Sequence, residues 1–172
     1  ENEEEVITDV KLVFTNTSDG SDVVEARAQD PDGAGIQELE ILDEINLDTS
    51  KVYDLTFEIF NNLDTPGEDI GEEIAEEDDE HQFFFSFSND AFDDPTGDGN
   101  IDDSGDPLNY NDTDGNGFPV GLSTTWSTPS TILSGGSFTV RLNHQPGGIK
   151  TATSGANDGD SDIDLTFVLN IE

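Results

Sequence analysis

The segment "DIDLTFVLNI", residues 162–171, constrains the fold more strongly than any other part of the sequence. Every second position in it is apolar, namely Ile163, Leu165, Phe167, Leu169 and Ile171. Alternation with a period of two places these side chains on one face of an extended strand and the polar residues between them on the other. Because an apolar face must be covered, the segment predicts a sheet that packs against a second layer.

The same alternation recurs along the chain. It is clear in residues 6–14, 51–60, 81–87 and 137–142, and weaker in 22–28, 36–42 and 120–126. Turn-forming segments rich in Asp, Gly, Pro and Asn separate these stretches. The pattern predicts an all-β fold, an antiparallel Ig-like or Greek-key β-sandwich of about eight strands with long acidic loops. Only residues 67–81 could hold a helical turn or two.

The length of 172 residues suits one domain. We expect an acidic tether at residues 1–5, "ENEEE", followed by a single β-sandwich domain at 6–172. The eleven Phe supply most of the bulk for a thin core, and the absence of Cys means that no disulfide supports it.

The charge balance excludes some partners. Forty-one acidic residues against five basic ones give a formal net charge of −36. Nucleic acids and anionic membranes both require basic patches, so we expect neither as a partner. Two explanations of the acidity remain open and are compatible with each other, namely a solvated surface suited to a salty habitat and specific sites for divalent cations.

The stretch "NYNDTDGNGFPVGL", residues 109–122, is the main candidate for a cation site. Asp112, Asp114, Asn116 and the glycine that follows reproduce the D-x-D-x-N-G start of a calcium loop, in which oxygens at alternate positions converge on an ion. The twelfth position is Ser123 instead of the glutamate of an EF-hand, so we expect a looser calcium loop of the extracellular kind.

The preceding stretch "DDPTGDGNIDDSGD", residues 93–106, extends this candidate site. It adds Asp98, Asn100 and Asp102 as ligand candidates, among other carboxylates that include Asp106. Hard oxygen ligands without a nearby cation favour Ca²⁺ over transition metals. We therefore expect Ca²⁺ as the cofactor, with a merely solvated acidic loop as the alternative.

The two histidines form a second candidate polar site. His81 opens one predicted strand and His144 closes another, each with the parity of its apolar neighbours. If these strands are antiparallel neighbours, the imidazoles meet at one rim of the core. A transition-metal site with Asp79 or Glu80 is one interpretation, but spacing secures too few ligands, so we expect hydrogen-bonded histidines without a metal.

Catalytic patterns are missing from the sequence. It has no Cys, no G-x-S-x-G and no H-E-x-x-H motif, and its acids are too abundant for any pair to indicate a glycosidase. Trp126 beside Tyr110 and Phe118 could stack on a sugar, although a core position for Trp126 is the better expectation. We therefore expect a protein that is not an enzyme.

Four segments together carry a resemblance to a known family. They are "EEIAEEDDEHQFFF" (72–85), "NYNDTDGNGFPVGLSTTW" (109–126), "RLNHQPGGIKTATSG" (141–155) and "GDSDIDLTFVLNI" (159–171). They resemble a family of Bacteroidota surface lipoproteins with uncharacterised β-sandwich domains, whose members often carry the label type 1 periplasmic binding fold superfamily.

The resemblance implies a location more than a ligand. It implies a lipid anchor upstream of Glu1, with "ENEEE" resembling the signal for export to the outer face of the outer membrane, so the protein is expected there or secreted. The expected function is a calcium-stabilised, non-enzymatic binding module, accessory to a TonB-dependent receptor or another surface protein. The alternative is a structural subunit of an extracellular filament or surface layer, in which copies of the chain are each other's partners.

Overall fold

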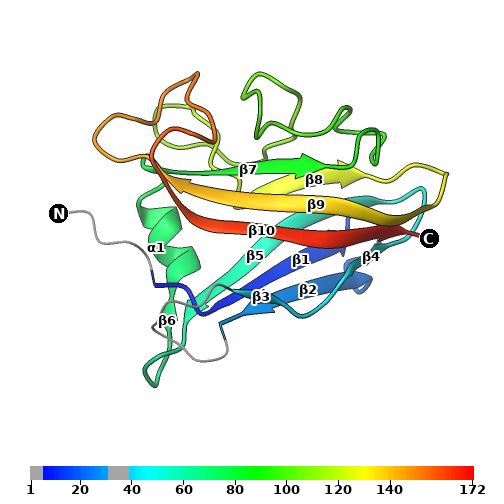
Figure 1. Cartoon of the computed structure of the whole chain (residues 1–172), viewed down its shortest axis with the longest axis horizontal. Helices are drawn as coiled ribbons and strands as arrows, with labels where there is room; N and C mark the ends of the chain where they lie inside the picture. Colours follow the sequence, from blue (N-terminus) through cyan, green and yellow to red (C-terminus); the bar gives the residue numbers. More distant parts are fainter. Residues whose placement is uncertain (1–5, 31–38) are drawn as a thin grey trace.

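A computed structural model describes residues 6–30 and 39–172 of the chain (Figure 1). The predicted tether at 1–5 lies outside the described residues, as do residues 36–38 of the weak strand predicted at 36–42.

Two sheets stack on each other, as the alternating pattern predicts (Figure 1). The lower sheet contains β1 (Asp9–Asn16), β2 (Val23–Gln29), β3 (Glu40–Ile41), β5 (Val52–Asn61), β6 (Glu68–Asp69) and β8 (Ser123–Ser127). Its order is β3-β2-β1-β5-β6, and β8 also pairs with β5. The upper sheet contains β4 (Ile45–Leu47), β10 (Asp160–Ile171), β9 (Leu133–His144) and β7 (His81–Phe87), in that order.

The prediction of an all-β sandwich is confirmed, with ten strands in the described residues instead of about eight. The two additions, β4 and β6, have three and two residues, which is too short for a period to be recognised. One feature departs from a purely antiparallel arrangement, because β4 pairs with β10 in parallel.

The single described helix, α1 (Ile70–Glu76), falls within the stretch where helical turns were expected. Asp69 caps it, since the carboxylate accepts a hydrogen bond from the backbone N–H of Glu72 at 3.2 Å. Ile70 and Ile74 bury one side of the helix in the core.

β10 is central in its sheet, paired with β4 on one side and β9 on the other. All five of its alternating apolar side chains are buried, while Asp164 and Val168 on the opposite face are exposed. The alternating pattern therefore correctly predicted both the strand and which of its two faces is buried.

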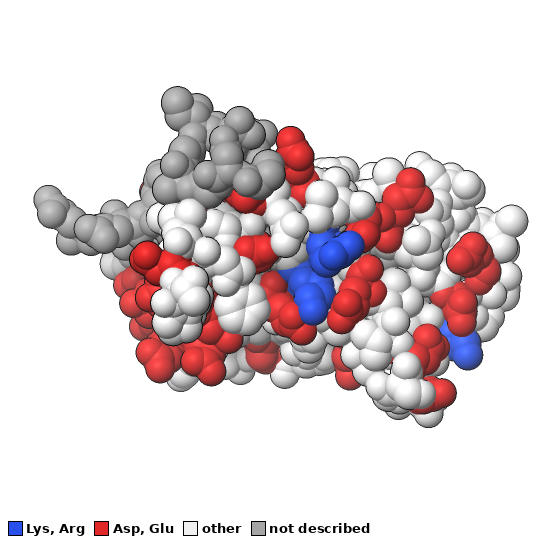
Figure 2. Space-filling model, turned by 90° about the horizontal axis from the view of Figure 1, so that it is seen from below, with Lys and Arg blue, Asp and Glu red and all other residues white. Residues whose placement is uncertain are grey.

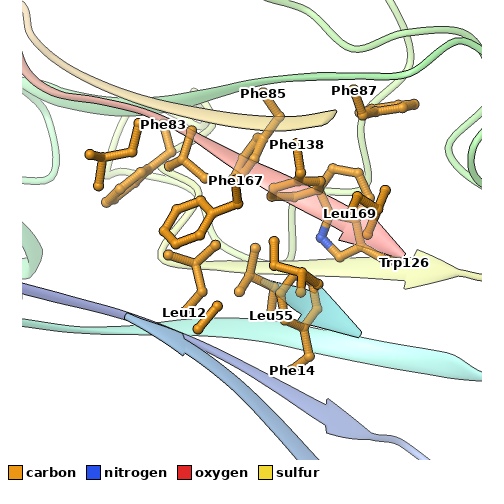
Figure 3. Close-up of a cluster of buried hydrophobic side chains, with 14 of the residues drawn as sticks. Leu12, Phe14, Leu55, Phe83, Phe85, Phe87, Trp126, Phe138, Phe167 and Leu169 are labelled. Carbon is orange, nitrogen blue, oxygen red and sulfur yellow. The ribbon is translucent and has the colours of Figure 1, made fainter. Parts of the chain in front are cut away.

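Aromatic side chains fill the space between the sheets (Figure 3). Trp126 is fully buried, and its ring makes edge contacts with Phe85, Phe87 and Phe138 at centroid separations of 5.0–5.4 Å. Its indole N–H donates to the hydroxyl of Thr124 at 2.8 Å. Trp126 is therefore a core residue, as expected, and its ring is not available to stack on a sugar.

Candidate functional site

The long connection between β7 and β8, residues 88–122, covers the free edge of the upper sheet (Figure 1). Three outward N–H groups of β7 find partners in it: Phe87 donates to the carbonyl of Asp98, Phe85 to the side-chain oxygen of Asn100, and Phe83 to the carbonyl of Val120. These bonds measure 2.7–3.0 Å. The connection therefore pairs with β7 as a neighbouring strand would, and it occupies the edge from Phe83 to Phe87 to which another chain could otherwise add.

The same connection covers the outer edge of β8. Ser127 donates to the carbonyl of Asp94 at 2.7 Å, and Thr125 donates to the carbonyl of Asn109 at 3.0 Å. One loop thus closes one side of the sandwich across both sheets. We call residues 88–122 the cover loop.

At one position, the backbone of the cover loop passes so close to β7 that only glycine fits. Gly99 has φ +100°, and a Cβ at this position would lie 2.1 Å from the carbonyl oxygen of Phe85. Only glycine fits both the backbone conformation and the space.

Asp112, the first residue of the predicted calcium motif, binds the backbone of the loop itself. Its two carboxylate oxygens accept hydrogen bonds from the N–H groups of Gly121 and Leu122, each at 2.9 Å. Such charge-assisted bonds fix the return of the chain toward β8.

Asp114, the second residue of the motif, closes a tight turn. One oxygen accepts from the N–H groups of Asn116 at 2.8 Å and Phe118 at 2.9 Å. The other lies 3.1 Å from the ammonium of Lys150, and both side chains are fully buried. Lys150 also donates to the carbonyl of Asp78 at 2.6 Å, so it ties the cover loop to the segment that follows α1.

The pKa of Asp114 reflects these contacts. Burial by itself raises it, but the N–H of Phe118, the ammonium of Lys150 and the N–H of Asn116 together outweigh burial and hold the pKa below its ordinary value. A lysine from a distant part of the sequence therefore supplies the positive charge that the local sequence lacks. An ion at Asp112, Asp114 and Asn116 would have to displace Lys150 and several backbone hydrogen bonds.

The other half of the predicted calcium set forms a group at the surface. Asp98 and Asp102 come together with Asp106, and one carboxylate oxygen from each lies within 4.8 Å of the others. Asn100 does not join them, because its side chain is buried between the N–H of Phe85 and the hydroxyl of Tyr110. We call Asp98, Asp102 and Asp106 the acidic triad.

Mutual repulsion is visible in the triad. The pKa of Asp106 is raised, first by partial desolvation and then by the negative charges of Asp103, Asp102 and Asp98. A cation at this point would relieve that repulsion.

A pocket of about 180 Å³ lies beside Asp106, between the cover loop and the segment around Thr151. Amide and hydroxyl groups line much of it, from Gln82, Asn100, Tyr110 and Ser154. The hydroxyl of Tyr110 donates to the carbonyl of Phe83 at 2.6 Å, and its enclosure raises the pKa to about 12. Tyr110 is therefore a fixed wall of the pocket.

The two histidines meet, as their parity predicts. His81 and His144 are directly opposite each other in the antiparallel pair β7–β9, and their rings stack with centroids 4.4 Å apart. Both are buried. Burial lowers the pKa of His81, so this imidazole is neutral at pH 7.

Charge over the described surface is overwhelmingly negative. Figure 2 shows acidic side chains spread across the face seen from below, with basic side chains in a few places among them. Lys11 bridges Glu25 and Glu58 across three strands of the lower sheet, while Arg27 pairs with Asp43. In the described part of the chain, Lys150 is the one Lys or Arg that is buried.

Comparison with known proteins finds no matching family model, no matching curated protein and no matching solved structure. Among the described residues, no helix is long and apolar enough to cross a membrane. Function must therefore be inferred from the geometry of the chain itself.

Proposed function

We propose that this protein is a non-enzymatic binding module of the cell surface, stabilised by Ca²⁺ and accessory to another surface protein such as a TonB-dependent receptor. The cover loop is the observation that carries the proposal. It is pinned to β7 and β8 by backbone hydrogen bonds, so its outer side is a rigid platform that bears the acidic triad and the adjoining pocket.

Calcium suits the chemistry of the triad. Three carboxylates can supply the hard oxygen ligands that Ca²⁺ requires, and main-chain carbonyls and water complete such sites in loops. Extracellular modules of this kind bind Ca²⁺ at roughly 10⁻⁴–10⁻³ M. We therefore place calcium at Asp98, Asp102 and Asp106, and assign to Asp112 and Asp114 the structural role that their hydrogen bonds support.

The second candidate is a structural subunit of a filament or surface layer. Polymerisation by strand addition needs a free sheet edge or an open groove. In the described ranges, the edges of β7 and β8 are covered. On the opposite side, β3 pairs with only Ala28 and Gln29 of β2, and β4 pairs with only Leu169–Ile171 of β10. Strand addition would therefore have to use the outer edges of β2 and β10, and the covered edges of β7 and β8 are what favours the binding module.

A size measurement separates these two candidates. Light scattering on the purified chain, with Ca²⁺ and after EDTA, should give a monomer in both conditions. Assembly that depends on Ca²⁺ would favour the filament or surface layer.

A thermal shift tests the calcium part. With about 5 mM CaCl₂, the linkage between binding and folding stabilises the native state by about 1–2 kcal/mol for the expected affinities. This corresponds to roughly 2–8 °C in Tm for a chain of this size, more than NaCl of equal ionic strength (about 15 mM) should give.

Two charge-matched variants complete the test. Asp98→Asn with Asp102→Asn and Asp106→Asn should abolish the calcium-specific shift. Removing three other exposed carboxylates, by Asp64→Asn, Glu76→Gln and Asp79→Asn, should preserve it. Equal shifts from both salts would instead indicate general screening of a −36 surface.

A further inference from the structure

The ring of His81 contains an open ligand position. Its Nε2 atom has no hydrogen-bond partner, and because the residue is completely buried, solvent cannot supply one. Leaving a buried polar atom unpaired costs free energy, and the great majority of such atoms in proteins are satisfied. The position therefore requires an explanation.

The other nitrogen of the ring determines its tautomer. Nδ1 of His81 lies 3.0 Å from the carbonyl oxygen of Glu77. A carbonyl oxygen only accepts hydrogen bonds, so Nδ1 carries the proton in the neutral ring. Nε2 then bears a bare lone pair. This is the arrangement of a metal-binding histidine, whose second nitrogen donates to a carbonyl and thereby fixes the ring.

Two further ligand groups lie close to the ring of His81. One nitrogen from each of His81 and His144 and one carboxylate oxygen of Glu77 all lie within 4.8 Å of one another. The carboxylate of Glu80 also reaches this corner, 3.4 Å from Nε2 of His144.

We propose that His81, His144 and Glu77 form a binding site for a divalent late transition-metal ion, of which Zn²⁺ is the test case. Imidazole nitrogen with one carboxylate suits Zn²⁺ and its neighbours, whereas Ca²⁺ and Mg²⁺ prefer oxygen alone. The sequence alone identified only the two histidines as possible ligands, so a metal-free pair was expected. The fold adds the carboxylate of Glu77 and the unpaired Nε2 of His81, and on these grounds we propose a metal site instead.

Binding requires a modest contraction of the site. Zinc–nitrogen bonds of about 2.0–2.1 Å in a tetrahedron put neighbouring ligand atoms about 3.3–3.4 Å apart. Glu77 is exposed and lies just after α1, so its side chain can close on the ion while the buried rings tilt toward it. Glu80 or water can supply the fourth ligand. This site does not depend on the calcium proposal, since the two share no residue.

The two histidines make a direct test practical. Because the chain contains only these two, the imidazole C–H protons give two sets of signals in an NMR spectrum of the untagged protein. We would add ZnCl₂ in the presence of about 5 mM CaCl₂, which occupies the hard oxygen sites and competes poorly for nitrogen. The signals of both imidazoles should shift, or be replaced by new signals in slow exchange. This change should be complete near one equivalent of zinc.

Variants assign the ligands. His144→Gln and Glu77→Gln should each weaken zinc binding at least about tenfold by calorimetry, which is the scale for lost metal-site interactions. Glu76→Gln removes the same charge from the neighbouring exposed position and should leave the affinity unchanged. Zinc binding that leaves both imidazoles unmoved, or no binding beyond that of the His144→Gln variant, would overturn the proposal. The wild-type NMR result stands even if a variant fails to fold.

Discussion

The buried pair between Lys150 and Asp114 gives the sharpest prediction about stability. Lys150→Met keeps the length and apolar stem of the side chain but removes the ammonium. This leaves the carboxylate of Asp114 buried without its cation and the carbonyl of Asp78 without its donor. Removing one partner of a buried ion pair costs about 3–5 kcal/mol. For a chain of this size, we expect a fall in Tm of roughly 6–20 °C.

A surface lysine provides the matched control. Lys11→Met changes the net charge by the same amount, but the side chain of Lys11 is 27% exposed and its partners are about half exposed. Exposed pairs contribute about 0–1 kcal/mol, so Tm should fall by no more than about 4 °C. Replacing both buried partners, by Lys150→Met with Asp114→Asn, should recover part of the loss because no unpaired charge remains. The reasoning is refuted if Lys150→Met costs no more than Lys11→Met in thermal unfolding.

Three further predictions concern pH and backbone. Because the pKa of Asp114 is lowered in the folded state, its ionised carboxylate stabilises the fold above the unfolded pKa of about 3.9, and this stabilisation is lost as pH falls through the folded pKa. In urea unfolding, the free energy of unfolding of Asp114→Asn should therefore decrease less over that pH range than that of the wild type. Because the folded pKa of His81 is also lowered, the unfolded chain takes up a proton first, and the free energy of unfolding should decrease as pH falls below about 6.5, less so in His81→Gln. Gly99→Ala should lower Tm by more than Gly97→Ala: both glycines have positive φ, but only at Gly99 does an added Cβ meet backbone, and equal losses would contradict this account of the cover loop.

The sequence predicted the sandwich because a strand with one buried face has an apolar residue at every second position. It also predicted that His81 and His144 meet, since equal parity and opposite strand ends place them together in an antiparallel pair. β4 and β6 escaped prediction because strands of two or three residues carry no measurable period.

The candidate site was only half predictable. The D-x-D-x-N-G pattern predicted a calcium loop, and in the structure the carboxylates of Asp112 and Asp114 accept hydrogen bonds from backbone N–H groups. A motif cannot say whether an ion, backbone N–H groups or a distant lysine satisfies those oxygens. Lys150 is remote in sequence and reaches Asp114 only through the fold. Glu77 was missed because its place beside the histidines depends on how α1 leads into β7.

The calcium site on the cover loop is the central claim, and equilibrium dialysis with radioactive calcium tests it most directly. A background of about 100 mM NaCl shortens the range of diffuse attraction to about 10 Å and leaves coordination intact. The account predicts one saturable Ca²⁺ per chain, with Kd of roughly 10⁻⁴–10⁻³ M. Binding should be lost when Asp98, Asp102 and Asp106 are changed to Asn, and retained in the variant that lacks Asp64, Glu76 and Asp79. Indistinguishable isotherms for these two variants would contradict the claim.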